Sequence, residues 1–129
     1  MPKATSTSQA RIAKKNVRPG PKGNFRRNTP GKNRLETAFS EYLHKLWLAG
    51  EILDYKYESA KLRLARNTFY TPDFLAVYPD EFHIYEVKGH WEEDARQKIK
   101  WAAQLYWYFR FFGVQREKKS GEWLFEEFF

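Results

Sequence analysis

Hydrophobic residues recur at helical spacing in the segment NRLETAFSEYLHKLWLAG, residues 33–50. The apolar positions, three or four residues apart, are Leu35, Ala38, Phe39, Tyr42, Leu43, Leu46 and Trp47. Asn33 is a favourable N-terminal cap, and Gly50 is a typical helix stop. The pattern therefore predicts an amphipathic helix that begins near Asn33 and ends before Gly50.

Three further segments have the composition of β-strands. EILDYKYESAKLRLA, residues 51–65, places Tyr, Leu and Ile among charged residues, which predicts one long strand or two short ones. PDFLAVY and FHIYEVK, residues 72–78 and 82–88, predict two more strands, and Pro79 and Asp80 predict the turn between them. We therefore expect these two segments to form a hairpin.

The C-terminal part of the chain predicts a second helix and a second hairpin. We expect the helix to run from about Glu92 to Phe112 and to end at Gly113. The remaining segment, VQREKKSGEWLFEEFF, predicts a hairpin with its turn at Ser120 and Gly121. Helices on either side of a run of strands predict an α/β fold, with a mixed central β-sheet flanked by helices.

Apolar side chains cover almost every side of this second predicted helix. They are Trp101, Leu105, Tyr106, Trp107, Tyr108, Phe109, Phe111 and Phe112. A helix that is apolar all round is buried or lies in an interface. Because so small a domain leaves little room for complete burial, we expect a homodimer. Packing in the core and stacking on DNA bases are the alternatives.

Positive charge is concentrated at the N-terminus. Residues 1–34 hold ten of the 23 Lys and Arg residues and none of the 16 Asp and Glu residues, so the net charge of +7 originates there. The segment is rich in Gly, Pro, Ser and Asn, a composition typical of disorder. We interpret residues 1–33 as a basic, flexible DNA-binding arm and residues 34–129 as the folded domain. The side chains expected to bind phosphates are Lys14, Lys15, Arg18, Lys22, Arg26, Arg27, Lys32 and Arg34.

Two other interpretations of the basic segment stay open, a solvated tail without a role and an organellar transit peptide. The glycines and prolines disfavour the transit peptide, because they interrupt an amphipathic helix. The absence of cysteine excludes disulfides and thiolate metal sites. No apolar run approaches the roughly 20 residues of a membrane span, and no signal-peptide core follows the N-terminus. We expect an intracellular protein without a membrane partner.

Acidic residues and a lysine on the first predicted hairpin are the main candidates for a chemical site. Glu86 and Lys88 project to one face of their strand, while Val87 points to the other. In a hairpin, Asp73 at the start of the neighbouring strand would lie beside Glu86. Two carboxylates and the Val87 carbonyl form an oxygen site of the kind that binds Mg²⁺ or Mn²⁺. An ordinary surface ion pair between Glu86 and Lys88 is the alternative.

Glu36 is a candidate third carboxylate. Asn33 and Glu36 have the N-x-x-E spacing of a capping box, which is a purely structural role. The helical pattern also places Glu36 on the flank of the apolar stripe, from which it can reach the sheet, whereas Glu41 lies on the wet side. The sequence leaves both roles open, the helix cap and the metal ligand.

An acid on a helix, then Pro-Asp, then Glu-x-Lys on the next strand resembles the PD-(D/E)XK nuclease superfamily. The segments LETAFSEYL, GEILDYKYE, YTPDF and EVKGHWEEDARQK further resemble the phage endonuclease I family, which resolves Holliday junctions. The similarity covers most of residues 34–100. It implies that Glu36, Asp73, Glu86 and Lys88 are the active-site acids and lysine.

The same resemblance implies a restriction-endonuclease-like fold and a homodimer that exchanges elements through ESAKLRLARN, residues 58–67. It also implies two active sites placed for paired nicks across a branch point, and a setting in phage-infected or prophage-carrying bacteria. Asp54 stands where the family has another functionally important acid, a glutamate. The long basic leader, the aromatic second helix and the C-terminal hairpin show little resemblance.

The function expected from these features is metal-dependent hydrolysis of DNA phosphodiesters, with branched DNA as the preferred substrate. Asp73 would bridge two Mg²⁺ or Mn²⁺ ions, with Glu86 and the Val87 carbonyl completing one site and Glu36 the other. Lys88 would position the attacking water. Lys98, on the second predicted helix, could touch the scissile strand. The alternatives are a phage or transposon-type endonuclease without branch preference and a non-catalytic basic nucleic-acid-binding protein.

Overall fold

The computed structural model describes residues 33–129. Of the side chains expected to bind phosphates, Arg34 is the first residue of a helix and is exposed. The other predicted phosphate-binding residues lie outside the described residues, and they are Lys14, Lys15, Arg18, Lys22, Arg26, Arg27 and Lys32. The role proposed for the arm therefore stays a prediction.

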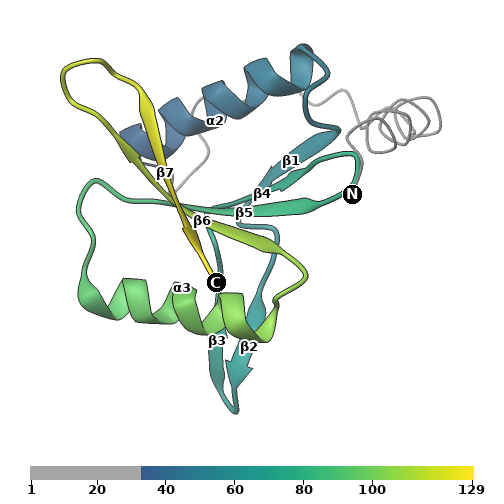
Figure 1. Cartoon of the computed structure of the whole chain (residues 1–129), viewed down its shortest axis with the longest axis vertical. Coiled ribbons are helices and arrows are strands. Elements are labelled where there is room, and N and C mark those ends of the chain that lie inside the picture. Colours follow the sequence, from purple (N-terminus) through teal and green to yellow (C-terminus); the bar gives the residue numbers. More distant parts are fainter. Residues whose placement is uncertain (1–32) are drawn as a thin grey trace.

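The described chain forms a mixed β-sheet with a helix on each side (Figure 1). Its elements are α2 (Arg34–Leu48), β1 (Asp54–Tyr57), β2 (Leu62–Ala65), β3 (Thr68–Tyr70), β4 (Phe74–Val77), β5 (Phe82–Val87), α3 (Glu93–Leu105), β6 (Arg110–Arg116) and β7 (Trp123–Phe128). The main sheet has the order β1-β4-β5-β6-β7, in which β5 and β6 are parallel and all other neighbours antiparallel. This arrangement confirms the predicted α/β class.

Local signals at both ends of α2 explain its boundaries. The Asn33 side chain accepts a hydrogen bond from the Glu36 backbone N–H at 2.8 Å and so satisfies one unpaired donor of the first turn. At the other end, Gly50 adopts a φ of 76°, a left-handed conformation that favours glycine. The helix predicted from the apolar pattern is confirmed.

The first predicted hairpin is also confirmed. β4 and β5 pair antiparallel, with Phe74 opposite Tyr85, and the Tyr78 backbone N–H closes the turn by donating to the Glu81 carbonyl at 2.9 Å. The segment from residue 51 to residue 65 forms two short strands. β1 joins β4 at the edge of the main sheet, whereas β2 pairs with β3 in a separate hairpin.

The two faces of the sheet pack against different elements. α2 covers one face, whose buried residues are Phe39, Leu43, Ile52, Phe74, Ala76, Tyr85, Val87 and Val114. α3 and the β2–β3 hairpin cover the other, whose buried residues are Leu62, Leu64, Tyr70, Ile84, Ile99, Ala102, Ala103, Phe111 and Phe128. Figure 1 shows these layers above and below the strands. Because successive residues of β5 alternate between the layers, Glu86 faces α3 and Val87 faces α2.

The second predicted helix is shorter than expected. α3 ends at Leu105, and the segment Arg110–Arg116 forms β6 instead of the last helical turns. The aromatic run therefore spans the end of a helix, a turn and a strand. Phe111 is fully buried on the sheet, whereas Trp107 and Tyr108 in the turn are 77% and 56% exposed. Strand pairing with β5 and β7 outweighed the helical spacing of these rings.

Gly113 occupies the middle of β6 and ends no helix. A Cβ at this position would lie 2.5 Å from the Trp91 ring and 3.0 Å from the Phe128 ring. The close approach of these two rings to the backbone is the reason that the strand has a glycine here. The C-terminal hairpin is as predicted, since β6 and β7 pair antiparallel and Gly121, in the turn, has a φ of 74°.

α3 is not apolar all round, so the helix gives no reason to expect a homodimer. The segment expected to exchange between subunits, residues 58–67, contains β2 and the turn to β3. This β2–β3 hairpin packs on α3 of its own chain, and the Tyr106 hydroxyl donates to the Arg63 carbonyl at 2.9 Å. The dimer and the exchange stay predictions. Within the described residues, no helix is long and apolar enough to cross a membrane.

Candidate active site

Asp73 and Glu86 lie side by side at one end of the β4–β5 hairpin. The register that pairs Phe74 with Tyr85 continues to this pair, and the two side chains are hydrogen-bonded to each other. Both are buried, with 8% and 7% of their surface exposed. Asp73 Oδ2 also accepts a hydrogen bond from the Val87 N–H at 2.8 Å. The predicted juxtaposition of these two carboxylates is confirmed.

Burial and mutual repulsion govern the ionisation of this pair. Burial, together with the nearby charge of Asp73, raises the pKa of Glu86 from 4.5 to about 8. Burial also raises the pKa of Asp73, although hydrogen bonds from Glu86 and from the Val87 N–H oppose the change. The pair therefore keeps a proton to a higher pH than exposed carboxyl groups do, and this proton lies between the two side chains.

Tyr70 holds the second oxygen of Glu86. Its hydroxyl donates to Glu86 Oε2 at 2.9 Å, and the ring is buried at the end of β3. Burial and the charge of Glu86 raise the pKa of Tyr70 well above its ordinary value, so the hydroxyl stays a donor. The sequence analysis missed this residue. Its signal was a tyrosine three residues before Asp73, at the end of a short strand.

Lys88 and Lys98 stand beside the carboxylates. They line an open cleft of about 280 Å³ together with Tyr70, Thr71, Asp73, Glu86 and Ala95. Lys88 follows Glu86 at the spacing that puts both side chains on one face, and its charge lowers the pKa of both acids. Lys98 reaches the cleft from α3. The structure therefore brings both predicted lysines to the acidic pair.

Glu36 approaches the same edge of the sheet from the α2 face. Its Oε1 accepts a hydrogen bond from the Asn33 side chain at 3.1 Å, and its Oε2 accepts one from the Tyr57 hydroxyl at 2.8 Å. Burial raises the pKa of Glu36, and the charge of Asp73 contributes to the rise. Glu36 thus holds the side chain of the N-cap residue Asn33 and lies within electrostatic reach of the acidic pair.

Glu58 is the acid that the strand β1 brings to this site. Its backbone N–H donates to the Asp73 carbonyl at 2.9 Å, and its charge contributes to the raised pKa of Asp73 and of Glu36. The sequence analysis missed it and favoured Asp54. The signal was the register itself, since pairing Tyr57 with Phe74 puts the next residue beside Asp73.

Asp54 lies at the opposite end of β1, opposite Val77. It accepts a hydrogen bond from the Tyr55 backbone N–H and forms an ion pair with Lys56 at 3.6 Å. Antiparallel pairing separates it from Asp73 by the length of β4. The structure therefore gives Asp54 no part in the acidic cluster.

The donor set fits a divalent cation that binds oxygen. Two buried carboxylates whose pKa values are both raised, chiefly by burial, gain stability when a cation lies between them. In an extended strand, the N–H and C=O of one residue project to the same side, so the Val87 carbonyl faces Asp73 together with the N–H. Within residues 33–129, no three acidic or histidine side chains are close enough to form a ready-made metal site. The arrangement offers one pair, with Glu36 and Glu58 at its border.

Comparisons with known protein families, with curated proteins and with solved structures found no match for this chain.

Proposed function

We propose that this protein is a divalent-metal-dependent DNA endonuclease that hydrolyses phosphodiester bonds, with the active site at Asp73 and Glu86. The observation that carries the proposal is the buried carboxylate pair at an open cleft, together with Lys88, which directly follows β5 and lines the same cleft. A buried like-charge pair is costly to keep. Its presence next to solvent favours a chemical role over a structural one.

Asp73, Glu86 and the Val87 carbonyl would hold one Mg²⁺ or Mn²⁺ ion. A bound ion of this kind activates a water molecule and stabilises negative charge on phosphoryl oxygens. A second ion would need Glu36, which would first have to release Tyr57 or Asn33. The residues therefore fit one ion directly and a second only after rearrangement on the α2 side.

Lys88 and Lys98 are placed where they could bind a phosphate group. Lys88, beside the carboxylates, would position the attacking water and offset the charge of the scissile phosphate. Lys98 would contact the same strand from α3. Both lysines belong to the cleft that the acids line, so the site combines a cation-binding half with a phosphate-binding half.

The resemblance to phage junction-resolving nucleases extends this proposal to branched DNA and to a homodimer with two active sites. A fold of the restriction-endonuclease type belongs to the same proposal, and the mixed sheet with one helix on each side is consistent with it. A non-catalytic nucleic-acid-binding protein is the competing function.

A cleavage assay on supercoiled plasmid tests the proposal. We expect strand scission in Mg²⁺ and none in EDTA, and a loss of at least about 10²-fold in Asp73→Asn and in Glu86→Gln. Asp54→Asn is the matched control, because it removes a carboxylate from the far end of β1, and it should cleave like the parent. Full activity of either site variant would refute the assignment, and binding without scission in any metal would favour the competing function.

Branch preference is a separate question. The comparison is between a labelled four-way junction and its component duplexes at equal salt concentration. Paired incisions placed symmetrically about the crossover would support junction resolution. Equal cutting of the linear arms would instead indicate a nuclease without branch preference.

A further inference from the structure

A second cavity, of about 420 Å³, lies on the other side of the segment that carries Lys88. Its lining residues come from the start of α2, the loop after β5 and the β6–β7 turn, and they are Leu35, Gly89, Arg116, Glu117, Lys118 and Gly121. Because Gly89 follows Lys88 directly, this cavity and the acidic cleft border the same stretch of backbone. The second cavity lies toward α2, and the acidic cleft lies toward α3.

The topology explains why the two cavities meet. β5 and β6 are parallel, and the Lys88 N–H donates to the Val114 carbonyl at 2.9 Å. The C-terminal ends of both strands therefore lie side by side at the same end of the sheet. The residues after Val114 therefore turn back next to the residues after Val87. Figure 1 shows the start of α2, the end of β5 and the β6–β7 turn on one side of the molecule, at the left of the view.

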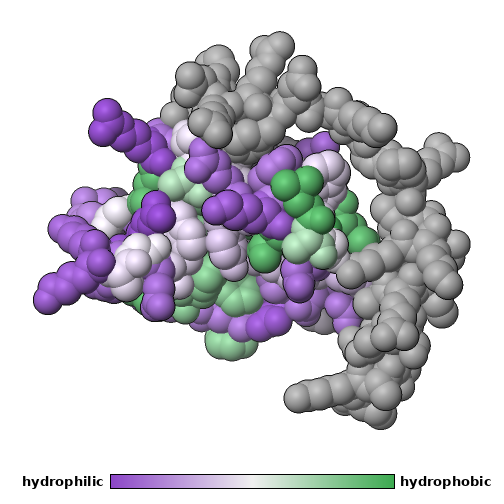
Figure 2. Space-filling model, turned by 90° about the horizontal axis from the view of Figure 1, so that it is seen from above, coloured by the Kyte–Doolittle hydropathy of each residue, from purple (hydrophilic) through white to green (hydrophobic). Residues whose placement is uncertain are grey.

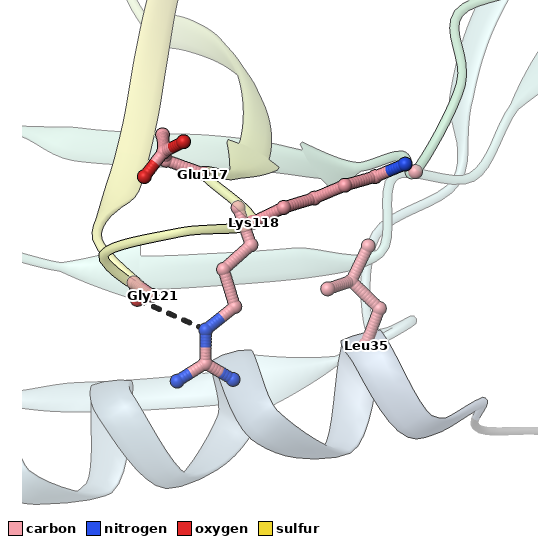
Figure 3. A pocket seen from close by; sticks show the side chains of 6 residues that line it. Leu35, Glu117, Lys118 and Gly121 are labelled. Atoms are coloured by element: carbon pink, nitrogen blue, oxygen red, sulfur yellow. Dashed lines mark hydrogen bonds between the residues drawn. The ribbon is translucent and has the colours of Figure 1, made fainter.

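The β6–β7 turn and the strand end before it carry both basic and acidic side chains. Arg116, Lys118, Lys119 and Glu122 are exposed, whereas the other acid, Glu117, is directed into the turn, where it accepts a hydrogen bond from the Ser120 N–H at 2.6 Å. Figure 3 shows Lys118 extended across the cavity, on the side away from the Glu117 carboxylate. Figure 2, which is seen from above Figure 1, shows hydrophilic side chains projecting at the left of the view, the side on which Figure 1 draws the β6–β7 turn.

Two other arginines, one on α3 and one on β6, are already paired with acids of β7. Arg96 binds Glu126 at 2.7 Å, and Arg110 binds Glu127 at 2.6 Å. Arg116 donates its Nε–H to the Gly121 carbonyl, and its guanidinium group lies over the Trp123 ring, so Arg116 stabilises the turn. Within the described residues, Lys118 forms no ion pair. A charge directed over a cavity without an acidic partner suits an external anion.

We propose that this cavity binds a backbone phosphate of the DNA strand that the acidic cleft cuts, with Lys118 as the main contact. The inference rests on the proposed function, because the acidic cleft defines the strand that is held. A strand that crosses this edge of the sheet would meet Lys98 and Lys88 on one side and Lys118 on the other. The turn thereby offsets the repulsion between the acidic cluster and DNA.

Salt dependence of DNA binding tests the inference independently of cleavage. The measurement is fluorescence anisotropy of a labelled DNA in EDTA at several salt concentrations, with the full chain, Lys118→Gln and Lys45→Gln. Lys45 is an exposed lysine near the far end of α2, so its substitution removes the same charge away from both cavities. We expect the slope of log K against log salt to become shallower by about 0.7–0.9 in Lys118→Gln only. Lys118→Arg should keep the parent slope.

A neutral methylphosphonate, placed at one DNA position at a time, locates the phosphate. One position near the cut should weaken binding by the full chain and have no effect on Lys118→Gln. Equal slopes for Lys118→Gln and Lys45→Gln would overturn the inference. The proposed function would still stand in that case if the parent protein cleaves DNA. A shallower slope without any cleavage would support the phosphate site and refute the nuclease. Absence of DNA binding by the full chain would overturn both.

Discussion

At the scale of single residues, Asp73 and Glu86 share one proton in the metal-free protein at neutral pH. Their positions could be predicted from strand alternation and the hairpin turn, since both depend on local pattern. Their surroundings could not. Tyr70 and Glu58 reach the pair through the end of a short strand and through a strand register, which depend on how distant segments meet.

The raised pKa of Glu86 predicts a pH dependence of stability. Between pH 4.5 and about 8, the folded protein keeps a proton that the unfolded chain has released, so the free energy of unfolding should fall as pH rises through this window. The slope should be at most about 1.4 kcal/mol per pH unit. Urea unfolding in EDTA at several pH values measures it. Glu86→Gln should flatten the dependence, and an equally steep curve for that variant would contradict the pKa assignment.

Tyr70→Phe tests the orientation of Glu86. Loss of the hydroxyl removes a hydrogen bond to the metal-binding carboxylate, and removal of such a partner typically weakens metal affinity by about 10–100-fold. It also removes an interaction that lowers the pKa of Glu86, so Mn²⁺ binding should require a higher pH. Calorimetric titration with Mn²⁺ at several pH values gives both quantities.

Tyr106→Phe is the matched control for that variant. It removes a hydroxyl that bonds to the β2–β3 hairpin and not to a carboxylate. Its Mn²⁺ affinity and pH dependence should equal those of the parent. An equal loss of Mn²⁺ affinity in both variants would show that Tyr70 acts only through the position of the hairpin.

At the scale of elements, the parallel pairing of β5 and β6 brings the C-terminal ends of both strands to the end of the sheet where the candidate active site lies. The helix α2, both hairpins and the mixed sheet could be predicted because each has a local signal: an apolar stripe, a cap, or a turn residue. β6 could not. Its rings have helical spacing in the sequence, and only its two neighbouring strands favour an extended conformation. The same strand brings the β6–β7 turn to the acidic cleft.

Gly113→Ala tests the position of β6. A methyl group there would overlap the Trp91 and Phe128 rings, and such overpacking typically destabilises a protein by about 1–3 kcal/mol. Chemical denaturation measures the change. Gly89→Ala is the control, because its Cβ would lie 4.0 Å from Leu35, an ordinary contact. A strong destabilisation by Gly89→Ala alone would contradict the packing described for this strand.

At the scale of the whole molecule, opposite charges are collected at one edge of the sheet. The acids Glu36, Glu58, Asp73 and Glu86 lie near one another, with Lys98 on the α3 side and Lys118 of the β6–β7 turn on the α2 side. Composition showed a basic arm but gave no sign of this second basic region, because the surrounding acids balance its charge. Only the fold separates the two signs in space.

The position of a bound metal ion tests the central claim most directly. Crystals grown with Mn²⁺ would give an anomalous scattering signal at each bound ion. We predict a signal between the carboxylates of Asp73 and Glu86, within bonding distance of the Val87 carbonyl, and its loss in Asp73→Asn. An empty site beside these carboxylates at a saturating Mn²⁺ concentration would contradict the account.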